Sequence, residues 1–169
     1  MHILIAFDLL LDAAPAARDG TTMASWSEFA AAAPELAERV KERLDAHRHK
    51  TIATLRADGS PRISGTEAGV EDGELKIGSM WQAVKARDLQ RDPRFALHSG
   101  SDEPDDWHGD AKLAGVAEEL ESGTTGGEPS HAFRLDLREV SIVGLNEERN
   151  GLVIDVWTAE GGLKTIRRK

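Results

Sequence analysis

The chain has 169 residues, of which 40% are apolar and 30% are charged, so it is long and apolar enough to form one globular domain with a sizeable core. It contains no cysteine and no tyrosine, which excludes disulfides, thiolate nucleophiles, cysteine-ligated metals and phenolic acid–base groups. Of the net charge of −9, −8 falls within residues 101–130, where nine acidic residues face a single lysine. The rest of the chain is nearly neutral, so the overall charge does not exclude an anionic ligand elsewhere.

Residues 1–24 are interpreted as an N-terminal extension of uncertain role, and residues 25–169 as one domain. The extension carries a short apolar run, Ile3–Phe7 and Leu9–Leu11, that Asp8 interrupts. No basic segment precedes this run, and it is too short to cross a bilayer. We therefore expect a cytoplasmic protein that does not contact a membrane.

Two helices are predicted. Ser25 and Ser27 are candidate N-caps, and a longer helix is expected over residues 34–48, with Pro34 in its first turn. Its apolar stripe is narrow and consists of Leu36, Val40 and Leu44. A shorter helix is expected from Ala83 to Arg91, ended by Asp92-Pro93.

Short strands separated by turns account for most of the remaining chain. Asp58-Gly59 is a strong signal for a hairpin turn, and residues 71–73 predict a second turn. The predicted strands are 51–56, 61–66, 68–70, 74–78, 94–98, 111–117, 133–137, 140–145, 151–158 and 163–167. The Gly/Thr/Pro-rich residues 123–129 predict a loop. This pattern favours a closed or nearly closed antiparallel β-barrel with peripheral helices.

The segment from Lys85 to Arg94 carries the clearest chemical signal. It places Lys85 near the N-terminus of the shorter helix, where free N–H groups and the helix dipole attract phosphate. Arg62, on the returning strand of the first hairpin, could converge on the same place. A solvated basic helix is the alternative interpretation.

Three stretches, Thr51–Arg62, Lys85–Leu89 and Arg91–Leu97, together resemble the pyridoxamine 5′-phosphate oxidase-like split β-barrel superfamily. The resemblance covers about residues 25–168 and is strongest to the flavin- and deazaflavin-dependent oxidoreductase branches. It implies an antiparallel split β-barrel and a homodimer with cofactor sites across its interface. It also implies FMN or the deazaflavin F420 as the cofactor, with haem ranked below them.

The resemblance also implies which residues bind the cofactor. Arg62 would open the strand that lines it, the backbone of the next four residues would edge its ring, and Lys85 would bind its phosphate. The full set is Arg62, Ile63, Ser64, Gly65, Thr66, Lys85 and Arg87. Three positions depart from the oxidase pattern, because Glu67 replaces a basic residue and Ala83-Val84 replace Ser-Arg. These departures argue against pyridoxamine phosphate oxidase activity and leave the choice between FMN and F420 open.

Trp81, His98 and Trp107 are candidates for lining a substrate pocket, since exposed aromatic rings near strand ends often mark binding sites. The acidic loop around Trp107 lacks the glycine and terminal glutamate of a calcium loop, so a solvated loop is expected and no metal is predicted. The sequence shows no basic face with interleaved aromatic residues, so nucleic-acid binding is not predicted.

Two functions remain open from the sequence. One is an FMN- or F420-dependent oxidoreductase acting on a small molecule, because a bound cofactor supplies redox chemistry that this chain lacks. The alternative is a non-catalytic protein that binds or sequesters flavin, F420 or haem on the same barrel. A dimeric domain whose pocket has decayed is a third hypothesis.

Overall fold

The computed structural model describes residues 22–121, 123–125 and 128–169, so the apolar run near the N-terminus lies outside the described residues. The helices are α1 (Trp26–Ala32), α2 (Pro34–Ala46) and α3 (Val84–Arg91), with a 3₁₀ turn, η1, at Pro104–Asp106. The strands are β1 (Lys50–Leu55), β2 (Pro61–Thr66), β3 (Ala68–Glu71), β4 (Glu74–Met80), β5 (Arg94–His98), β6 (Asp110–Glu119), β7 (Gly123–Thr125), β8 (Glu128–Leu145), β9 (Leu152–Thr158) and β10 (Gly162–Arg168).

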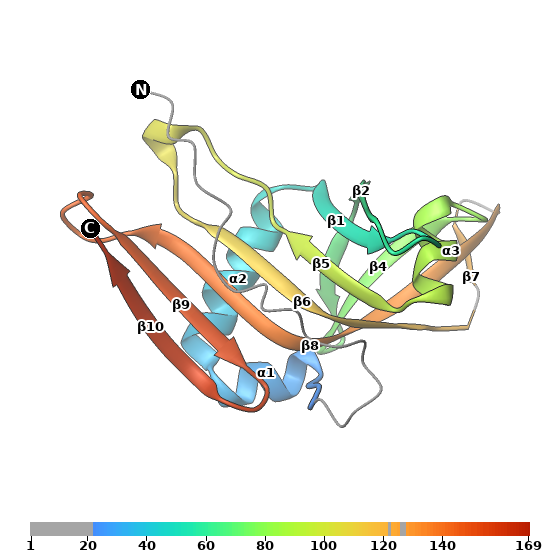
Figure 1. Ribbon diagram of the computed structural model, residues 1–169, viewed down its shortest axis with the longest axis horizontal. Helices are drawn as coiled ribbons and strands as arrows, with labels where there is room; N and C mark the ends of the chain where they lie inside the picture. The colour runs from blue at the N-terminus through green and yellow to red at the C-terminus, as the bar shows by residue number, and fades with distance from the viewer. Residues whose placement is uncertain (1–21, 122, 126–127) are drawn as a thin grey trace.

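The described strands form one antiparallel sheet in the order β10-β9-β8-β6-β5-β1-β2 (Figure 1). β8 is the central strand of the sheet, since it pairs with β6 and β9 and also with β4 and β7. Among the described strands, β2 pairs only with β1 and β3 only with β4. The barrel is therefore split between β2 and β3 rather than closed, and the outer edge of β2 keeps free backbone groups.

The predicted helices and hairpins are largely confirmed. Ser25 is the N-cap of α1 and forms a capping box with Glu28. α2 begins at Pro34 and ends at Ala46, two residues before the predicted end, and it buries the predicted stripe. α1 is a separate helix, so the described chain has three α-helices rather than two.

Two predictions about the second half of the chain were wrong. Gly123–Thr125 is a strand paired with β8 rather than part of a loop. The two strands predicted over 133–145 are one strand, β8, interrupted at Arg138 by a register shift against β6. The two residues between the predicted strands, Arg138 and Glu139, lie at this bulge.

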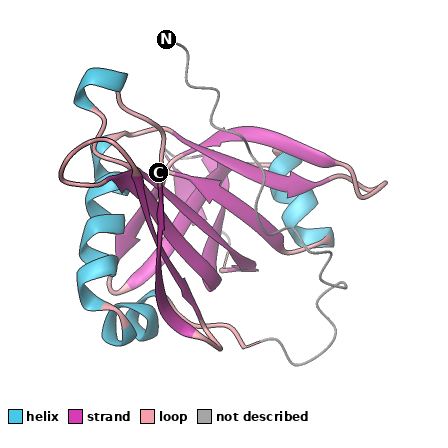
Figure 2. Cartoon of the chain, turned by 60° about the vertical axis from the view of Figure 1, so that its left-hand side comes forward, coloured by secondary structure: helices cyan, strands magenta, loops and turns pink. Residues whose placement is uncertain are grey.

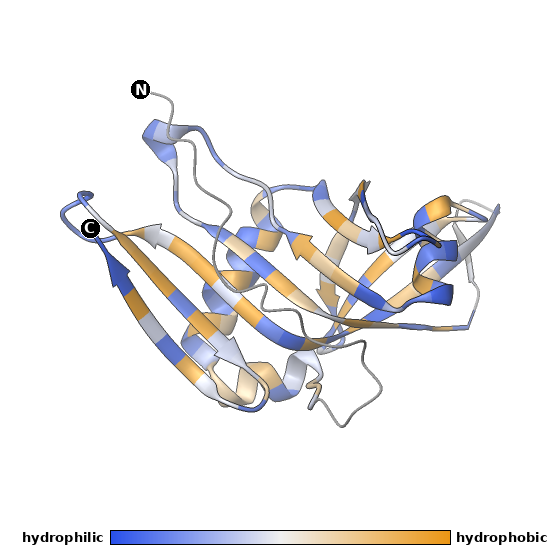
Figure 3. Ribbon diagram, in the orientation of Figure 1, coloured by the Kyte–Doolittle hydropathy of each residue, from blue (hydrophilic) through white to orange (hydrophobic). Residues whose placement is uncertain are grey.

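The core lies between the sheet and the helices α1 and α2, which stack against one of its faces (Figure 2). Strict alternation along the strands places every second residue on this face (Figure 3). One row of paired residues crosses the sheet there: Ile52, Leu97, Leu113, Val140 and Trp157. Trp157 and Trp26 both pack on Phe29 of α1.

The opposite side of the same strands is covered by none of the described helices and is called the open face below. Its members across β2, β1, β5 and β6 are Ile63, Ala53, Ala96, Ala114 and His98. Three of them are alanines, which make the surface flat, whereas the Ile63 side chain is 75% exposed. None of the described helices is long and apolar enough to cross a membrane.

Candidate functional site

The N-terminus of α3 faces the open edge of β2, and Lys85 joins the two. Its ammonium Nζ donates to the carbonyl oxygen of Gly65 at 2.7 Å. Lys85 occupies the first turn of α3, where Ala83 is the N-cap and no side chain caps the helix. The structure therefore places a cation beside the free N–H groups of a helix N-terminus, an arrangement that favours anion binding.

Lys85 is half-buried and forms no ion pair within the described part of the chain. Burial lowers the pKa of its ammonium below the ordinary lysine value, and the nearby Glu67 carboxylate opposes part of that effect. A partly desolvated cation without a counter-ion is stabilised by any anion that binds beside it. The site therefore favours an anionic ligand group.

Arg62 lies close to α3 but is already engaged. Its Nε donates to Asp88 of α3 at 2.6 Å, and Arg91 donates to the other carboxylate oxygen at 2.9 Å. Thr54 also donates to Asp88, at 2.9 Å, so this carboxylate is buried under three donors. Burial raises the pKa of Asp88, but the hydrogen bonds from these three groups lower it by more than burial raises it. The pKa of Asp88 is therefore below its ordinary value. The charge of Arg62 is thus partly compensated by Asp88, and Nε is no longer available to donate to a ligand.

The other residues expected to bind a cofactor are distributed over both faces of β2. Ile63 points to the open face and Ser64 to the core side, while the Thr66 hydroxyl is buried against the Glu67 carbonyl. The side chain of Arg87 is exposed on α3 and hydrogen-bonds to none of the described residues. Among these expected residues, Gly65 is the one whose hydrogen bond to Lys85 the described structure shows.

Sequence reasoning missed two charged residues of this region. Asp88 was not expected to be buried, because its partners Thr54 and Arg62 are far away in sequence. Lys50 is also buried, opposite Thr66, and burial lowers the pKa of its ammonium. The alternation of β1 contains the signal for Lys50, since it lies on the same side of the strand as Ile52 and Thr54.

The structure divides the three residues expected to line a substrate pocket. Trp107 and His98 are linked through Asp110, which accepts from Trp107 Nε1 at 2.9 Å and lies 3.7 Å from His98 Nε2. Burial lowers the pKa of His98, although the charge of Asp110 opposes this. Trp81, in the turn between β4 and α3, instead stacks on His131 of β8. That turn lies beside α3, at the opposite end of the molecule from the start of β6 (Figure 1). Asp110 is buried, so the expectation that it belongs to a solvated loop was wrong.

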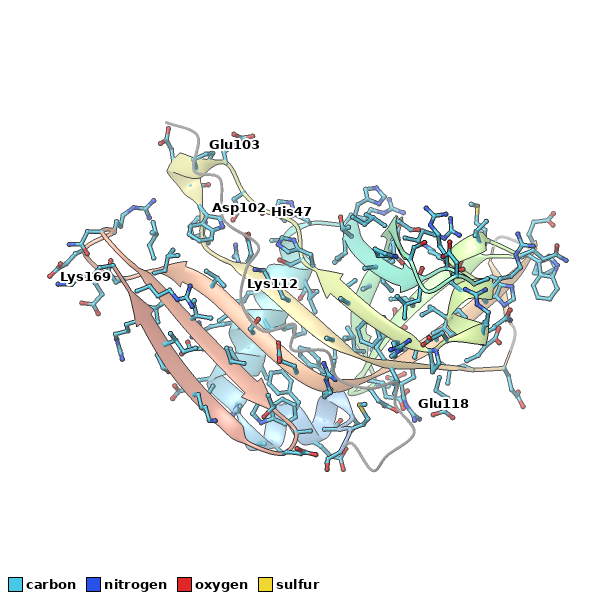
Figure 4. The ribbon with its side chains drawn as sticks, viewed as in Figure 1. His47, Asp102, Glu103, Lys112, Glu118 and Lys169 are labelled. Carbon is cyan, nitrogen blue, oxygen red and sulfur yellow. The ribbon has the colours of Figure 1, made fainter. Side chains whose placement is uncertain are left out.

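The acidic loop is fastened to the end of α2 by one carboxylate. Asp102 accepts from Arg43 Nη1 at 2.9 Å and contacts His47 Nε2 at 2.8 Å, as the neighbouring His47 and Asp102 side chains in Figure 4 show. The hydrogen bond from His47 lowers the pKa of Asp102 most, and the charge of Arg43 adds to this. Asp102 thus holds the loop against the end of α2 through its contacts with Arg43 and His47. Within the described residues, no three His, Asp or Glu side chains gather as a metal site.

A pocket beside α1 does not qualify as the functional site. Glu28, Glu74, Arg134 and Asp136 line it, together with residues 23–25. Arg134 pairs with Glu74, Asp136 and Glu118, so its charge is already compensated.

The residues present fit a planar cofactor that bears a phosphate, but with fewer ligands than the superfamily pattern has. Lys85 and the N-terminus of α3 would hold the phosphate, and the free edge of β2 offers N–H and C=O groups to a heteroaromatic ring. A Cβ added at Gly65 would meet nothing within 4 Å, so there is open space beside this strand. Glu67 and the Arg62–Asp88 pair weaken the positive field.

Known structures with the same architecture were found by structural comparison. PhzG from Burkholderia lata 383, solved with tetrahydrophenazine-1-carboxylic acid, superposes with a TM-score of 0.56 at 13% identity, covering 81% of this chain and 87% of its own. A haem-binding protein from Mycobacterium smegmatis gives 0.51 at 18% identity, covering 85% and 88%. The conserved hypothetical protein Rv2991 from Mycobacterium tuberculosis gives 0.51 at 21% identity, covering 61% and 81%.

This chain has the split-barrel fold of the pyridoxamine 5′-phosphate oxidase-like superfamily. The fold expected from the three sequence stretches is therefore confirmed, with the sheet left open between β2 and β3. No protein-family model matches the chain, and no curated protein does so. At these identities the comparison shows the fold alone, and the fold does not name a ligand.

Proposed function

We propose that this split barrel binds FMN or F420 along β2 and acts as an oxidoreductase on a small molecule. The observation that carries the proposal is Lys85, a half-buried cation that forms no ion pair with any described residue and is held against Gly65 at the outer edge of β2. When bound, the cofactor would supply hydride transfer. The chain's own residues would bind its phosphate at Lys85, orient its ring along β2 and shield it from water.

A second candidate is a non-catalytic protein that carries or sequesters flavin, F420 or haem. The Arg62–Asp88 pair and the Glu67 carboxylate beside Lys85 favour it, because they leave the phosphate fewer ligands than an oxidase site has. The M. smegmatis protein that shares the fold is a haem binder. The cytoplasmic location stays a prediction.

The absorbance spectrum of the purified protein distinguishes these candidates. We expect a flavin or deazaflavin band, either as purified or after addition of FMN or F420. A Soret band would identify haem and support the second candidate. A colourless protein that takes up none of the three would contradict both.

We further propose that a second copy of the chain covers the open face. Ile63 exposes 75% of its surface there, beside small alanines that permit close approach. Burying such a surface against a symmetric copy would also enclose the β2 edge.

Ile63→Glu is therefore expected to convert a dimer into a monomer, because the new carboxylate would be buried without a partner. Light scattering coupled to gel filtration measures this. Leu163→Glu is the matched control, since Leu163 is 51% exposed but pairs with Trp157 on the other face. A dimer that persists in Ile63→Glu, or a wild type that is monomeric, would contradict the proposal that the open face is a dimer interface.

A further inference from the structure

His131 is buried, with 5% of its surface exposed, and both of its ring nitrogens form hydrogen bonds. The backbone N–H of Gln82 donates to its Nε2 at 3.1 Å, so this nitrogen is an acceptor. Nδ1 therefore carries the hydrogen and donates to Glu119 Oε1 at 2.6 Å. These two bonds fix both the tautomer and the orientation of the ring.

Glu119 is in turn held by α3. The side-chain amide of Gln90 donates to both of its carboxylate oxygens, at 3.1 and 2.9 Å. Burial raises the pKa of Glu119, but the hydrogen bonds from Gln90 and His131 lower it below the ordinary value, so the group remains a carboxylate. His131 is thus braced by β6 and by the same helix that carries Lys85.

The braced imidazole supports the indole of Trp81. The two rings stack with their centroids 4.7 Å apart and their planes 7° from parallel. Trp81 nevertheless exposes 49% of its surface, so one side of the indole lies on His131 and the other is open. An aromatic ring fixed in this way presents a flat surface at low entropic cost.

The turn that carries Trp81 is held in an unfavourable conformation. Gln82 has a φ of 56°, in the left-handed region that costs a non-glycine residue about 1 kcal/mol. The bond from its N–H to His131 compensates, and the next residue, Ala83, is the N-cap of α3. The hydrogen bond to His131 therefore fixes the turn that leads directly into the first residues of α3, including Lys85.

Two exposed apolar residues and one lysine lie close to Trp81 along the chain. Met80 is 81% exposed and Val84 45% exposed, and both flank the turn. Lys85 follows directly. A ligand that combines a planar ring with an anionic group matches this arrangement better than water or a purely polar molecule does.

We propose that His131 is a positioning residue that holds Trp81 flat, and that the open side of Trp81 stacks on the planar ring of the ligand whose phosphate binds Lys85. This inference rests on the proposed function and adds to it the residue that selects a ring. Removing either side chain is expected to weaken the recognition of the ring, whereas removing Lys85 weakens the recognition of the phosphate.

Two substitutions of His131 separate its roles. His131→Gln keeps one donor for Glu119 and one acceptor for Gln82, whereas His131→Phe keeps a flat ring and loses both. The probes are FMN and its phosphate-free form riboflavin, or F420 and its phosphate-free deazaflavin core. His131→Phe and Trp81→Ala are expected to lose about tenfold in affinity for both members of a pair. His131→Gln and Trp81→Phe are expected to recover most of this loss.

Lys85→Ala is the matched comparison, since it should weaken binding of the phosphate-bearing member only. Stacking also has a spectroscopic signature that a merely structural role would not produce. Ligand binding should quench the tryptophan fluorescence that comes from Trp81, which is the part of the emission that Trp81→Phe removes. Binding should also give a long-wavelength charge-transfer absorbance. His131→Phe should weaken this absorbance and His131→Gln should keep it. Trp81→Ala is a surface change, so it tests the inference even where His131→Phe does not fold.

Four outcomes would overturn the inference. If the ligand binds without altering the emission of Trp81, or if Trp81→Ala binds as tightly as wild type, the inference fails while the proposed function stands. If Trp81→Ala turns a dimer into a monomer, a second copy covers the indole instead. A wild type that binds none of the four probes overturns the proposed function and this inference together.

Discussion

A Gly115→Ala variant is expected to lose about 3 kcal/mol or more of its free energy of unfolding, because the added methyl group has no room. A Cβ at Gly115 would lie 1.9 Å from the carbonyl oxygen of Asp136 and 2.9 Å from its carbonyl carbon. Both atoms belong to the backbone of β8, so no side-chain rotation relieves the contact. β6 and β8 would have to separate at the bulge that follows Leu137.

Urea denaturation followed by circular dichroism measures this loss. Gly78→Ala is the matched control, since Gly78 is also a strand glycine but a Cβ there would meet nothing within 4 Å. Its free energy of unfolding should stay close to that of wild type. Equal midpoints for the two variants would show that β6 and β8 do not approach as closely as described.

Asp88→Ala is the second variant with a large expected effect, again about 3 kcal/mol of unfolding free energy. The substitution removes the carboxylate that Arg62, Arg91 and Thr54 share and leaves two guanidinium groups without their counter-ion. The value lies at the low end for a broken buried ion pair, because both arginines are partly exposed and can reach water. Asp105→Ala, in the exposed η1 turn, should have no measurable effect.

The same carboxylate makes stability depend on pH. Since the folded protein lowers the pKa of Asp88, its contribution is fully present above the unfolded value of about 3.9. It is lost as pH falls through the folded pKa. Wild type should therefore lose stability in acid below about pH 4, and Asp88→Asn should lose less over the same range. An identical acid profile for the two proteins would mean that Asp88 is not an ion-pair partner in the fold.

Much of the fold could be predicted because its signals are local. The stripe Leu36, Val40 and Leu44 defines α2, and Asp58-Gly59 defines the hairpin of β1 and β2. The strand β7 could not be predicted, because its glycine and threonines signal a loop and only pairing with β8 makes them a strand.

The candidate site was predictable in part. The sequence placed Lys85 at a helix N-terminus, and the structure brings it to Gly65. Whether Arg62 is available to a ligand depends on Asp88, 26 positions later in the sequence, and that contact arises only when α3 packs on the first hairpin. The same reason explains why Trp81 was expected beside His98 and Trp107 but instead stacks on His131.

The central claim is that Lys85 binds the phosphate of a flavin or deazaflavin cofactor at the edge of β2. Its most direct test is the dissociation constant of FMN and of F420 for wild type and Lys85→Ala, with Lys41→Ala as the control. Lys41 is a partly exposed lysine that pairs with Asp45 on α2. We expect Lys85→Ala to weaken binding of the cofactor at least about tenfold, or about 1.4 kcal/mol, and Lys41→Ala to leave it unchanged. Equal affinity of wild type and Lys85→Ala, or no binding of either cofactor to wild type, would contradict the claim.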